Sequence, residues 1–250
     1  MSEAHETDGA LAARLAQEAG RVLLALRSGG TLSGKELGAA ADRAAHELLC
    51  RELRDHRPAD GLLSEEGKDD PARLARQRVW IVDPLDGTRE YGEGRADWAV
   101  HVGLAVDGVP VAGAVALPGL TPAAVLRSDR PQPLPPPRDP PRLVVSRTRP
   151  PRLAQEVAEA LGGALVPMGS AGAKAMAVVR GEAEIYLHAG GQYEWDSMAP
   201  VAVALAHGLH CSRLDGSPLR YNQPDTYLPD LLICRPELAP RVLALVADAA

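Results

Sequence analysis

The sequence predicts a mixed α/β protein with an α+β N-terminal part and an α/β C-terminal part. Three observations carry this prediction. Apolar residues before residue 60 recur at helical spacing, and residues 78–118 contain short β-branched runs. After a proline-rich stretch, short apolar runs alternate with helical segments, which is typical of layered α/β proteins. We therefore expect domains at residues 1–130 and 142–250, joined by a linker at residues 131–141.

The N-terminal part is expected to begin with two helices, at residues 9–27 and from about residue 37 to 53, because leucine and alanine recur there every three or four positions. The run "RVWIV" predicts a buried strand that ends at Asp83. Residues 97–118 predict two strands joined by Asp107-Gly108, a pair that favours a tight hairpin turn. The apolar face of this hairpin, residues 99–117, is one possible dimer interface.

The linker contains seven prolines in eleven residues, and proline fits neither a helix interior nor a central strand. The C-terminal part then predicts strands at 143–146, 164–167, 183–188, 210–213 and 231–235, and helices at 151–161, 171–180, 196–207 and the C-terminus.

Composition limits the partners of the protein. The net charge of −6 argues against nucleic acid or an anionic membrane as the main partner. The first twenty residues contain no apolar core of signal-peptide length, and no later run approaches a membrane span, so we expect a cytoplasmic protein that does not bind membranes. Cys50, Cys211 and Cys234 are odd in number and far apart, which favours reduced thiols.

The stretch "DPLDGT", residues 83–88, carries the first chemical signal. Pro84 holds Asp83 in an extended conformation, so Asp83 and Asp86 are expected to leave the strand close together. Gly87 lets the backbone approach a ligand, and a helix opening at Thr88 would direct N–H groups at a phosphate. Carboxylates beside a phosphate are the ligands that Mg²⁺ prefers. The alternative is a simple turn capped by the aspartates.

Two further stretches carry acids beside apolar elements. Glu65 and Glu66 follow a short apolar run at 61–64, and Asp196 follows Trp195 at the expected first turn of a helix. Taken alone, the glutamates could be a solvated surface pair, and Asp196 could be a helix N-cap.

Together, Glu65-Glu66, "WIVDPLDGT" at 80–88 and Trp195-Asp196 resemble the motifs of the inositol monophosphatase superfamily, which are lithium-sensitive, magnesium-dependent phosphatases. The resemblance runs from residue 9 to the end of the chain. It implies a layered α-β-α-β-α sandwich of the inositol monophosphatase and fructose-1,6-bisphosphatase type. It also implies a small-molecule phosphate ester as substrate and a homodimer as the assembly.

The resemblance also implies roles for individual residues. Thr88, positioned by Glu65 or Asp42, would orient and deprotonate the attacking water, and the Gly87 and Thr88 amides would hold phosphate oxygens, with Asp196 reaching the substrate as well. The segment "KELGAAAD" keeps the aspartate of the family motif, Asp42, but lacks its threonine. The alternative for Asp42 is therefore a solvated acid on a helix surface. The implied ligands of two or three Mg²⁺ ions are the carboxylates of Glu65, Asp83, Asp86 and Asp196 and the carbonyl of Leu85.

The substrate is implied by two stretches that resemble the CysQ-type branch, the adenosine 3′,5′-bisphosphate phosphatases: "DPLDGTREY" and residues 169–186. By this resemblance Ser170 and Lys174 face the nucleotide, whereas a solvated helix residue is the alternative for Lys174. His188 and Ala171 depart from the branch pattern. We therefore expect some breadth, with the 5′-phosphosulfate, inositol phosphates and fructose 1,6-bisphosphate as secondary substrates.

Three other functions are alternatives to a phosphatase of this superfamily. Haloacid dehalogenase phosphatases use D-x-D-G-T, and this chain has one residue more between its aspartates. A calcium-binding EF-hand needs acids at alternate positions over twelve residues. A metal- or nucleotide-binding module without turnover is the remaining alternative. His101 and His188 are expected to be packing or rim residues, because no cluster of His and Cys surrounds them.

Overall fold

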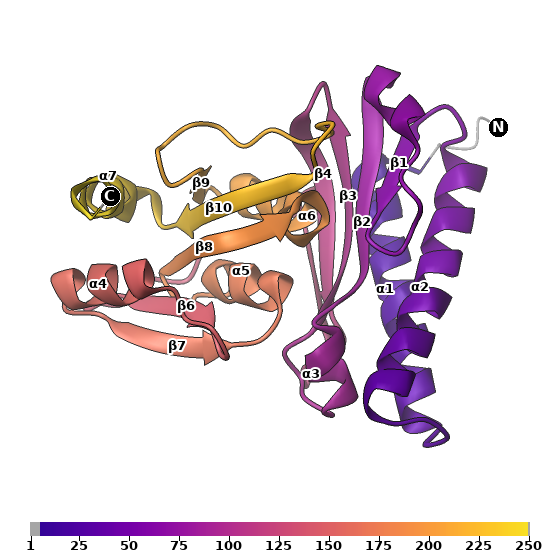
Figure 1. The fold of residues 1–250 in the computed structure, drawn as a ribbon, viewed down its shortest axis with the longest axis horizontal. Coiled ribbons are helices and arrows are strands. Elements are labelled where there is room, and N and C mark those ends of the chain that lie inside the picture. The colour runs from indigo at the N-terminus through magenta and orange to yellow at the C-terminus, as the bar shows by residue number, and fades with distance from the viewer. Residues whose placement is uncertain (1–5, 250) are drawn as a thin grey trace.

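The elements of the protein stack in five layers, as the computed structural model of residues 6–249 shows (Figure 1). Two sheets alternate with three layers of helices, which confirms the α-β-α-β-α sandwich. The helices, in layer order, are α1 (Asp8–Ser28) and α2 (Gly34–His56), then α5 (Ala171–Val179) and α6 (Glu194–Ala206), then α4 (Arg152–Leu161) and α7 (Ala239–Asp248).

The first sheet has the strand order β1-β2-β3-β4-β5, in which β1 and β2 are parallel and the other pairs are antiparallel. Its outer face is covered by α1 and α2. The strands are β1 (Gly61–Ser64), β2 (Arg78–Asp86), β3 (Ala99–Val106), β4 (Val109–Leu117) and β5 (Ala124–Arg127). The hairpin turn at Asp107-Gly108 is confirmed, with positive φ at both residues.

Strand β2 does not end at Asp83, as expected, but continues to Asp86. Asp83 pairs with His101 and Asp86 with Ala99, so β2 has one residue more than β3 across this step. Residues three apart in a regular strand point to opposite faces, whereas the extra residue of a bulge turns both to the same face. Pro84, which lacks an N–H group, lies inside this irregular step. The bulge therefore aims both aspartates at one site.

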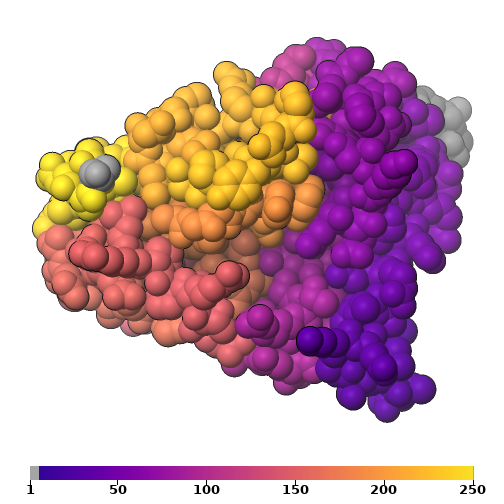
Figure 2. Space-filling view, in the orientation of Figure 1, coloured from indigo at the N-terminus to yellow at the C-terminus, as the bar shows by residue number. Residues whose placement is uncertain are grey.

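The second sheet has the order β7-β6-β8-β10-β9 and is parallel from β7 to β8 and antiparallel from β8 to β9. Its strands are β6 (Arg142–Ser146), β7 (Ala164–Met168), β8 (Ile185–Tyr193), β9 (His210–Ser212) and β10 (Tyr227–Cys234). The short helices of the chain are α3 (Thr88–Gly92), η1 (Pro71–Ala75) and η2 (Pro236–Leu238). Residues 131–141 form no helix or strand. The domain division stays a prediction, and the two parts pack as one body (Figure 2).

Two glycines bring helix α6 close to the first sheet. Gly103 and Gly113 lie opposite each other on β3 and β4. A Cβ on Gly103 would lie 2.4 Å from the sulfur of Met198, and one on Gly113 would lie 2.8 Å from the carbonyl oxygen of Ala199. Because α6 can settle into this groove, its first turn, with Asp196, reaches the acids of β2.

The hairpin β3–β4 is covered on one face by α1 and on the other by α6. Most of its residues are buried, and Val109 and Val111 are its exposed apolar side chains. The expectation that the hairpin face 99–117 forms a dimer interface is therefore wrong, because helices of the same chain already cover it.

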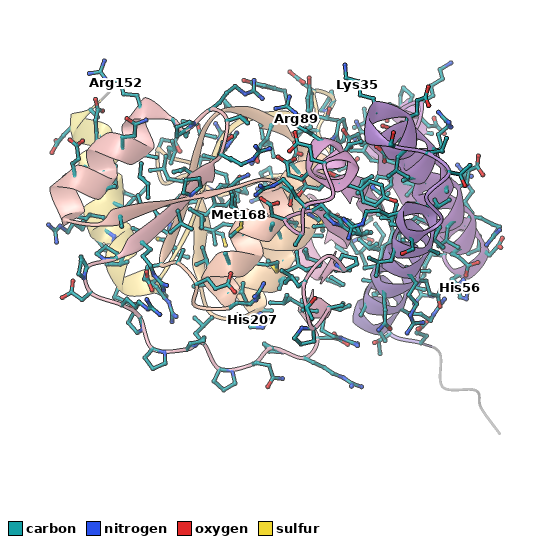
Figure 3. All side chains as sticks on the ribbon, turned by 90° about the horizontal axis from the view of Figure 1, so that it is seen from below. Lys35, His56, Arg89, Arg152, Met168 and His207 are labelled. Carbon is teal, nitrogen blue, oxygen red and sulfur yellow. The ribbon has the colours of Figure 1, made fainter. Side chains whose placement is uncertain are left out.

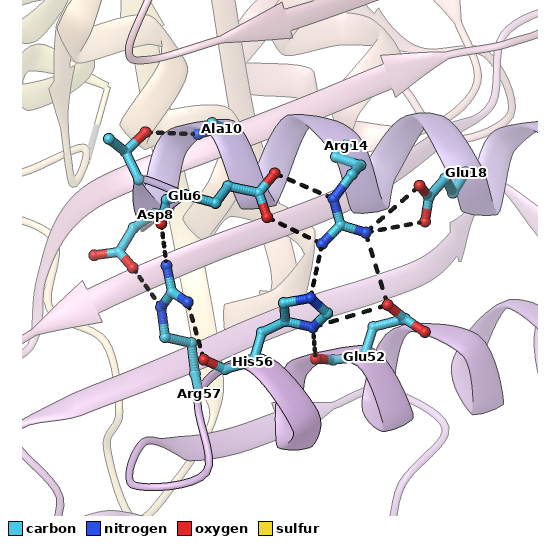
Figure 4. Close-up of polar contacts among 9 residues, drawn as sticks. Glu6, Asp8, Ala10, Arg14, Glu18, Glu52, His56 and Arg57 are labelled. Atoms are coloured by element: carbon cyan, nitrogen blue, oxygen red, sulfur yellow. Dashed lines mark hydrogen bonds and ion pairs between the residues drawn. The ribbon is translucent and has the colours of Figure 1, made fainter. Parts of the chain in front are cut away.

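A network of ion pairs joins α1 to the end of α2 (Figure 4). The guanidinium of Arg14 lies 3.0 Å from Glu6 and 3.7 Å from Glu52, and that of Arg57 lies 2.8 Å from Asp8. Exposed pairs contribute about 0–1 kcal/mol each, so their main effect is to fix how the two helices lie against each other. This matters for the site because α2 carries Asp42.

Within the described residues, no helix combines the length and the apolar character that a membrane span requires. Cys50, Cys211 and Cys234 are all free thiols.

Candidate metal centre and active site

Three aspartates from two distant elements come together between the sheets. Carboxylate oxygens of Asp83 and Asp86, from β2, and of Asp196, from α6, lie within 4.8 Å of one another. Asp83 is 1% exposed and Asp86 is 7% exposed. Such a set of oxygen donors fits a hard divalent cation such as Mg²⁺.

Asp86 joins the two parts of the chain at this centre. Its carboxylate accepts hydrogen bonds from the backbone N–H groups of Gly172 at 2.6 Å and Ala171 at 3.2 Å, at the start of α5. On the other side, His101 Nε2 lies 3.2 Å from Asp86 Oδ2. Although burial alone would raise the pKa of Asp86, the hydrogen bond and charge of His101 lower it, which keeps this carboxylate ionised.

His101 is fully buried and holds its orientation through a second contact, 2.9 Å from Nδ1 to the carbonyl oxygen of Trp195. Burial would lower the pKa of His101, but the contact with Asp86 raises it overall. His101 is buried, as expected for a packing residue, but it also contacts Asp86, a candidate metal ligand, which the sequence did not predict. A histidine inside an otherwise apolar strand was the available signal.

The other acids of the centre hold protons more tightly than usual. Burial, followed by the charges of Glu65 and Asp86, raises the pKa of Asp83 well above its ordinary value. Burial and the charge of Asp86 raise the pKa of Asp196 to about 6. The pKa of Glu65 is raised to about 7 by burial of its carboxylate and by the negative charges of Asp196 and Asp86, although much of the Glu65 side chain is exposed. A bound cation would relieve this repulsion, so the residues present fit Mg²⁺.

Hydrogen bonds also orient the acids. Asp83 accepts a bond of 3.0 Å from the N–H of Leu85, and Asp196 accepts one of 2.6 Å from the N–H of Tyr193 within a capping box. Asp196 is thus a helix cap as well as a member of the acid group, so the two readings of this residue do not exclude each other.

Thr88 and Asp42 meet beside the acids. The Thr88 hydroxyl lies 3.3 Å from Asp42 Oδ2 and 3.1 Å from the carbonyl oxygen of Leu85. Asp42 is 5% exposed, so the alternative of a solvated helix acid is wrong. Burial, with the charges of Glu66 and Glu65, raises the pKa of Asp42 to about 8. Its Oδ1 atom is buried without a hydrogen-bond partner among residues 6–249, so this oxygen is available for a hydrogen bond or a cation.

Gly87 has the backbone geometry that the motif predicted. Its φ of +87° favours glycine, and helix α3 begins at the next residue, Thr88. A Cβ on Gly87 would lie 2.9 Å from the Cβ of Ser170, so the loop before α5 packs directly on the metal motif.

Ser170 and Lys174 are buried rather than open to solvent. The Ser170 hydroxyl accepts a hydrogen bond of 2.9 Å from the N–H of Ala173 and caps α5. The Lys174 ammonium donates to the carbonyl oxygens of Ser170, at 2.9 Å, and Gly169. The alternative of a solvated Lys174 is therefore wrong, and contact of either residue with a nucleotide stays a prediction.

The loop before α5 is also held from the first part of the chain. Asp97 accepts hydrogen bonds from the N–H of Gly169, at 2.7 Å to its carboxylate, and from the N–H of Ser170, at 3.2 Å to its carbonyl oxygen. Asp97 therefore positions this loop.

A cavity of about 590 Å³ opens beside Thr88, Asp42 and Glu65, between α2 and α3. Lys35, Arg43 and Arg89 also line it. Figure 3 shows Lys35 and Arg89 on the same edge of the molecule. The cavity gives water and anions access to the Thr88 side of the centre.

Comparison with known proteins identifies the family. The model of the inositol monophosphatase family matches residues 4–130 and 141–249. A Mycobacterium tuberculosis protein named 3′-phosphoadenosine 5′-phosphate phosphatase is 53% identical over 242 residues, which cover 93% of this chain and 90% of that protein. The Escherichia coli protein named 3′(2′),5′-bisphosphate nucleotidase CysQ is 32% identical over 210 residues, which cover 76% of this chain and 81% of that protein.

A solved structure agrees with these relatives. The structure of CysQ from Bacteroides thetaiotaomicron, described as a bacterial member of the inositol monophosphatase family, superimposes with a TM-score of 0.79 at 27% identity. The match covers 93% of this chain and 98% of that one. With the layered fold, the acid group and the Thr88–Asp42 pair in place, the chain belongs to the inositol monophosphatase family.

Proposed function

We propose that this protein is a magnesium-dependent, lithium-sensitive phosphatase that removes the 3′-phosphate of adenosine 3′,5′-bisphosphate to give AMP. The adenosine 3′-phosphate 5′-phosphosulfate is its second substrate, which places the enzyme in sulfur assimilation. The observation that carries the proposal is the acid group of Asp83, Asp86 and Asp196 beside the Thr88–Asp42 pair. The names of relatives that are 53% and 32% identical support the choice of substrate.

The residues that would hold two or three Mg²⁺ ions are the carboxylates of Glu65, Asp83, Asp86 and Asp196 and the carbonyl of Leu85. When bound, Mg²⁺ supplies positive charge to the phosphate oxygens and lowers the pKa of a water ligand.

Thr88 orients the attacking water. Its hydroxyl accepts a proton from the water and passes its own proton to Asp42 Oδ2, which lies 3.3 Å away. Burial and the charges of Glu66 and Glu65 raise the pKa of Asp42 to about 8 when no cation is bound, which makes its carboxylate a stronger base than that of an ordinary aspartate. The Gly87 and Thr88 amides hold the phosphate oxygens. The water oxygen bonds to phosphorus, and the bond from phosphorus to the ribose 3′-oxygen breaks with its electron pair left on that oxygen. The 3′-oxygen takes a proton from solvent, phosphate and AMP leave, and Asp42 returns its proton to solvent.

The direction of attack places the nucleoside. In an in-line displacement the attacking and leaving oxygens lie on opposite sides of phosphorus. Thr88 and Asp42 lie on the side of the cavity between α2 and α3. We place the leaving nucleoside on the opposite side and assign that side to Asp196, from α6, and the second sheet.

The proposed enzyme is a cytoplasmic homodimer. Three free thiols support a reducing, cytoplasmic location. The family resemblance supports a homodimer, which light scattering after size-exclusion chromatography tests directly.

Phosphate release tests the function. Purified protein with Mg²⁺ is incubated with adenosine 3′,5′-bisphosphate, inositol 1-phosphate or fructose 1,6-bisphosphate, each with and without Li⁺. We expect at least tenfold preference for the bisphosphate nucleotide, about 1.4 kcal/mol in the barrier, and loss of turnover with Li⁺ or in Asp83→Ala. Faster phosphate release from inositol 1-phosphate or fructose 1,6-bisphosphate would keep the mechanism and change the assigned substrate. Absence of phosphate release from all three would indicate a binding module without turnover.

A further inference from the structure

The aromatic residues of this chain are divided sharply between core and surface. The chain has three Trp, five Tyr and no Phe. Five of these eight side chains are at most 1% exposed: Trp80, Trp98, Tyr91, Tyr186 and Tyr221. Of the other three, Tyr193 contacts both Trp195 and Tyr227, and we refer to the three residues as the aromatic cluster.

The two tyrosines of the aromatic cluster are exposed, whereas Trp195 is partly buried and packs against the core. The rings of Tyr193 and Trp195 stack with centroids 4.9 Å apart and planes 12° apart, and Tyr227 meets Tyr193 edge to face at 6.0 Å. Tyr193 is 46% exposed and Tyr227 is 47% exposed. In a chain that buries its other aromatic rings, a preformed stack left on the surface is a feature that points to a ligand.

The cluster is bonded to the proposed active site through its backbone. The N–H of Tyr193 donates to Asp196 Oδ2 at 2.6 Å, and the carbonyl oxygen of Trp195 contacts His101, which in turn contacts Asp86. The cluster therefore lies next to the acid group, on the side of Asp196. This is the side on which an in-line displacement begun at Thr88 places the leaving nucleoside.

The ring of Tyr227 packs directly on the backbone beneath the cluster. Gly190 and Gly191 both have positive φ, and a Cβ on Gly191 would lie 2.3 Å from the hydroxyl oxygen of Tyr227. Tyr193 and Tyr227 are paired residues of the neighbouring strands β8 and β10, which fixes their spacing. The two tyrosines are thus held at set positions before any ligand arrives.

We propose that the aromatic cluster is the platform on which the purine base of the nucleotide substrate stacks. The inference rests on the proposed function and extends it to the choice between substrates. A base offers a flat π-face to Tyr193 and Tyr227, whereas inositol and sugar phosphates offer none. The acid group is expected to bind the phosphate of each substrate in the same way, whereas only a nucleotide also gains the stacking contact. The platform therefore favours nucleotides over other phosphate esters.

Kinetics of Tyr193→Ala and Tyr227→Ala test the platform. For adenosine 3′,5′-bisphosphate we expect kcat/KM to fall by about 5- to 150-fold, the range of base–aromatic stacking, mainly through KM. For inositol 1-phosphate, which has no base, kcat/KM is expected to stay within twofold. Tyr193→Phe keeps the ring and should retain the wild-type KM. Val111→Ala removes an exposed apolar side chain from β4 and serves as the matched control.

A binding measurement tests the platform without turnover. Trp80 and Trp98 are buried, so AMP added in the presence of Mg²⁺ should quench the fluorescence of Trp195. The quenching is expected to disappear in Trp195→Phe and to need at least fivefold more AMP in Tyr193→Ala.

The outcomes separate the inference from the proposed function. An equal fall for both substrates in Tyr193→Ala, or unchanged KM with a shift from dimer to monomer, would overturn the platform and assign the cluster to packing or to an interface between copies. Absence of turnover in the wild type would overturn the proposed function alone, because quenching by AMP still reports on the platform.

Discussion

Thr88 is the residue on which the proposed proton transfer depends, because its hydroxyl contacts both Asp42 and the Leu85 carbonyl oxygen. We expect Thr88→Ala to lower kcat by about 10²- to 10⁴-fold, the range of a positioned acid–base group. Thr88→Ser keeps the hydroxyl and should stay within tenfold of the wild type. Steady-state kinetics with saturating Mg²⁺ measure both, and a Thr88→Ala enzyme with wild-type kcat would exclude the relay through Thr88.

His101 is a positioning residue for Asp86, from which its Nε2 atom lies 3.2 Å away. Partners that orient metal ligands typically change metal affinity by 10- to 100-fold when they are removed. We expect His101→Leu to weaken Mg²⁺ binding by that factor, and His101→Gln, which keeps a donor, to weaken it less. Titration calorimetry with Mg²⁺ alone gives the dissociation constants, and unchanged affinity in His101→Leu would show that His101 only packs.

At this scale the acids could be predicted from their motifs, but their partners could not. Asp83, Asp86 and Asp196 are marked by the residues beside them in the chain. The contact of His101 with Asp86 depends instead on strand register and on the depth at which α6 packs. The burial of Lys174 similarly depends on the loop that folds over it.

At the scale of elements, the start of α5 is joined to the bulged end of β2. The N–H groups of Ala171 and Gly172 donate to Asp86, and Gly172 leaves room for His101. A Cβ at Gly172 would lie only 2.0 Å from His101 Nε2.

We expect Gly172→Ala to destabilise the protein by about 1–3 kcal/mol, as overpacking does, and to weaken Mg²⁺ binding by displacing Asp86. Gly29→Ala is the matched control, since φ there is −67° and the nearest contact of its Cβ would be an ordinary 3.5 Å. Chemical denaturation of both variants measures the difference, and equal stability would show that α5 and β2 are not coupled in this way.

The longer elements could be predicted because their periodicity extends over many residues. Helices α1 and α2 and the β3–β4 hairpin lie within a few residues of their expected positions. The edge strands β1 and β5 have four residues each and carry too little pattern to be recognised. The continuation of β2 past Pro84 was missed because the proline and the polar residues there favour a turn.

At the scale of the whole molecule, three carboxyl groups of the site, those of Asp42, Glu65 and Asp196, make the stability depend on pH. Folding raises the pKa of Asp42 to about 8, of Glu65 to about 7 and of Asp196 to about 6, from ordinary values near 4. At pH values between about 4 and about 8, the folded protein binds more protons than the unfolded chain, so the free energy of unfolding decreases as the pH rises.

In EDTA we therefore expect a lower Tm at pH 8 than at pH 6, by at least about 2 °C. Saturating Mg²⁺ should reduce this difference, because it neutralises the same carboxylates. His188 and His210 have lowered pKa values and act in the opposite direction, but equally with and without Mg²⁺. Scanning calorimetry at pH 6 and pH 8 gives the Tm values in EDTA and in Mg²⁺. An equal pH dependence of Tm under both conditions would exclude a metal role for the carboxyl groups of Asp42, Glu65 and Asp196.

The family motifs, the layered fold class and the acids of the candidate metal centre can be recognised in the amino-acid sequence alone, because each lies in a short local pattern. The groups that support those acids, and the surface that lies beside them, depend instead on how the elements pack in three dimensions. Asp86 meets α5 because a bulge turns it inward, and α6 brings Asp196 to it because Gly103 and Gly113 leave a groove. Such contacts join residues up to about a hundred positions apart, and no local pattern specifies the distance between them.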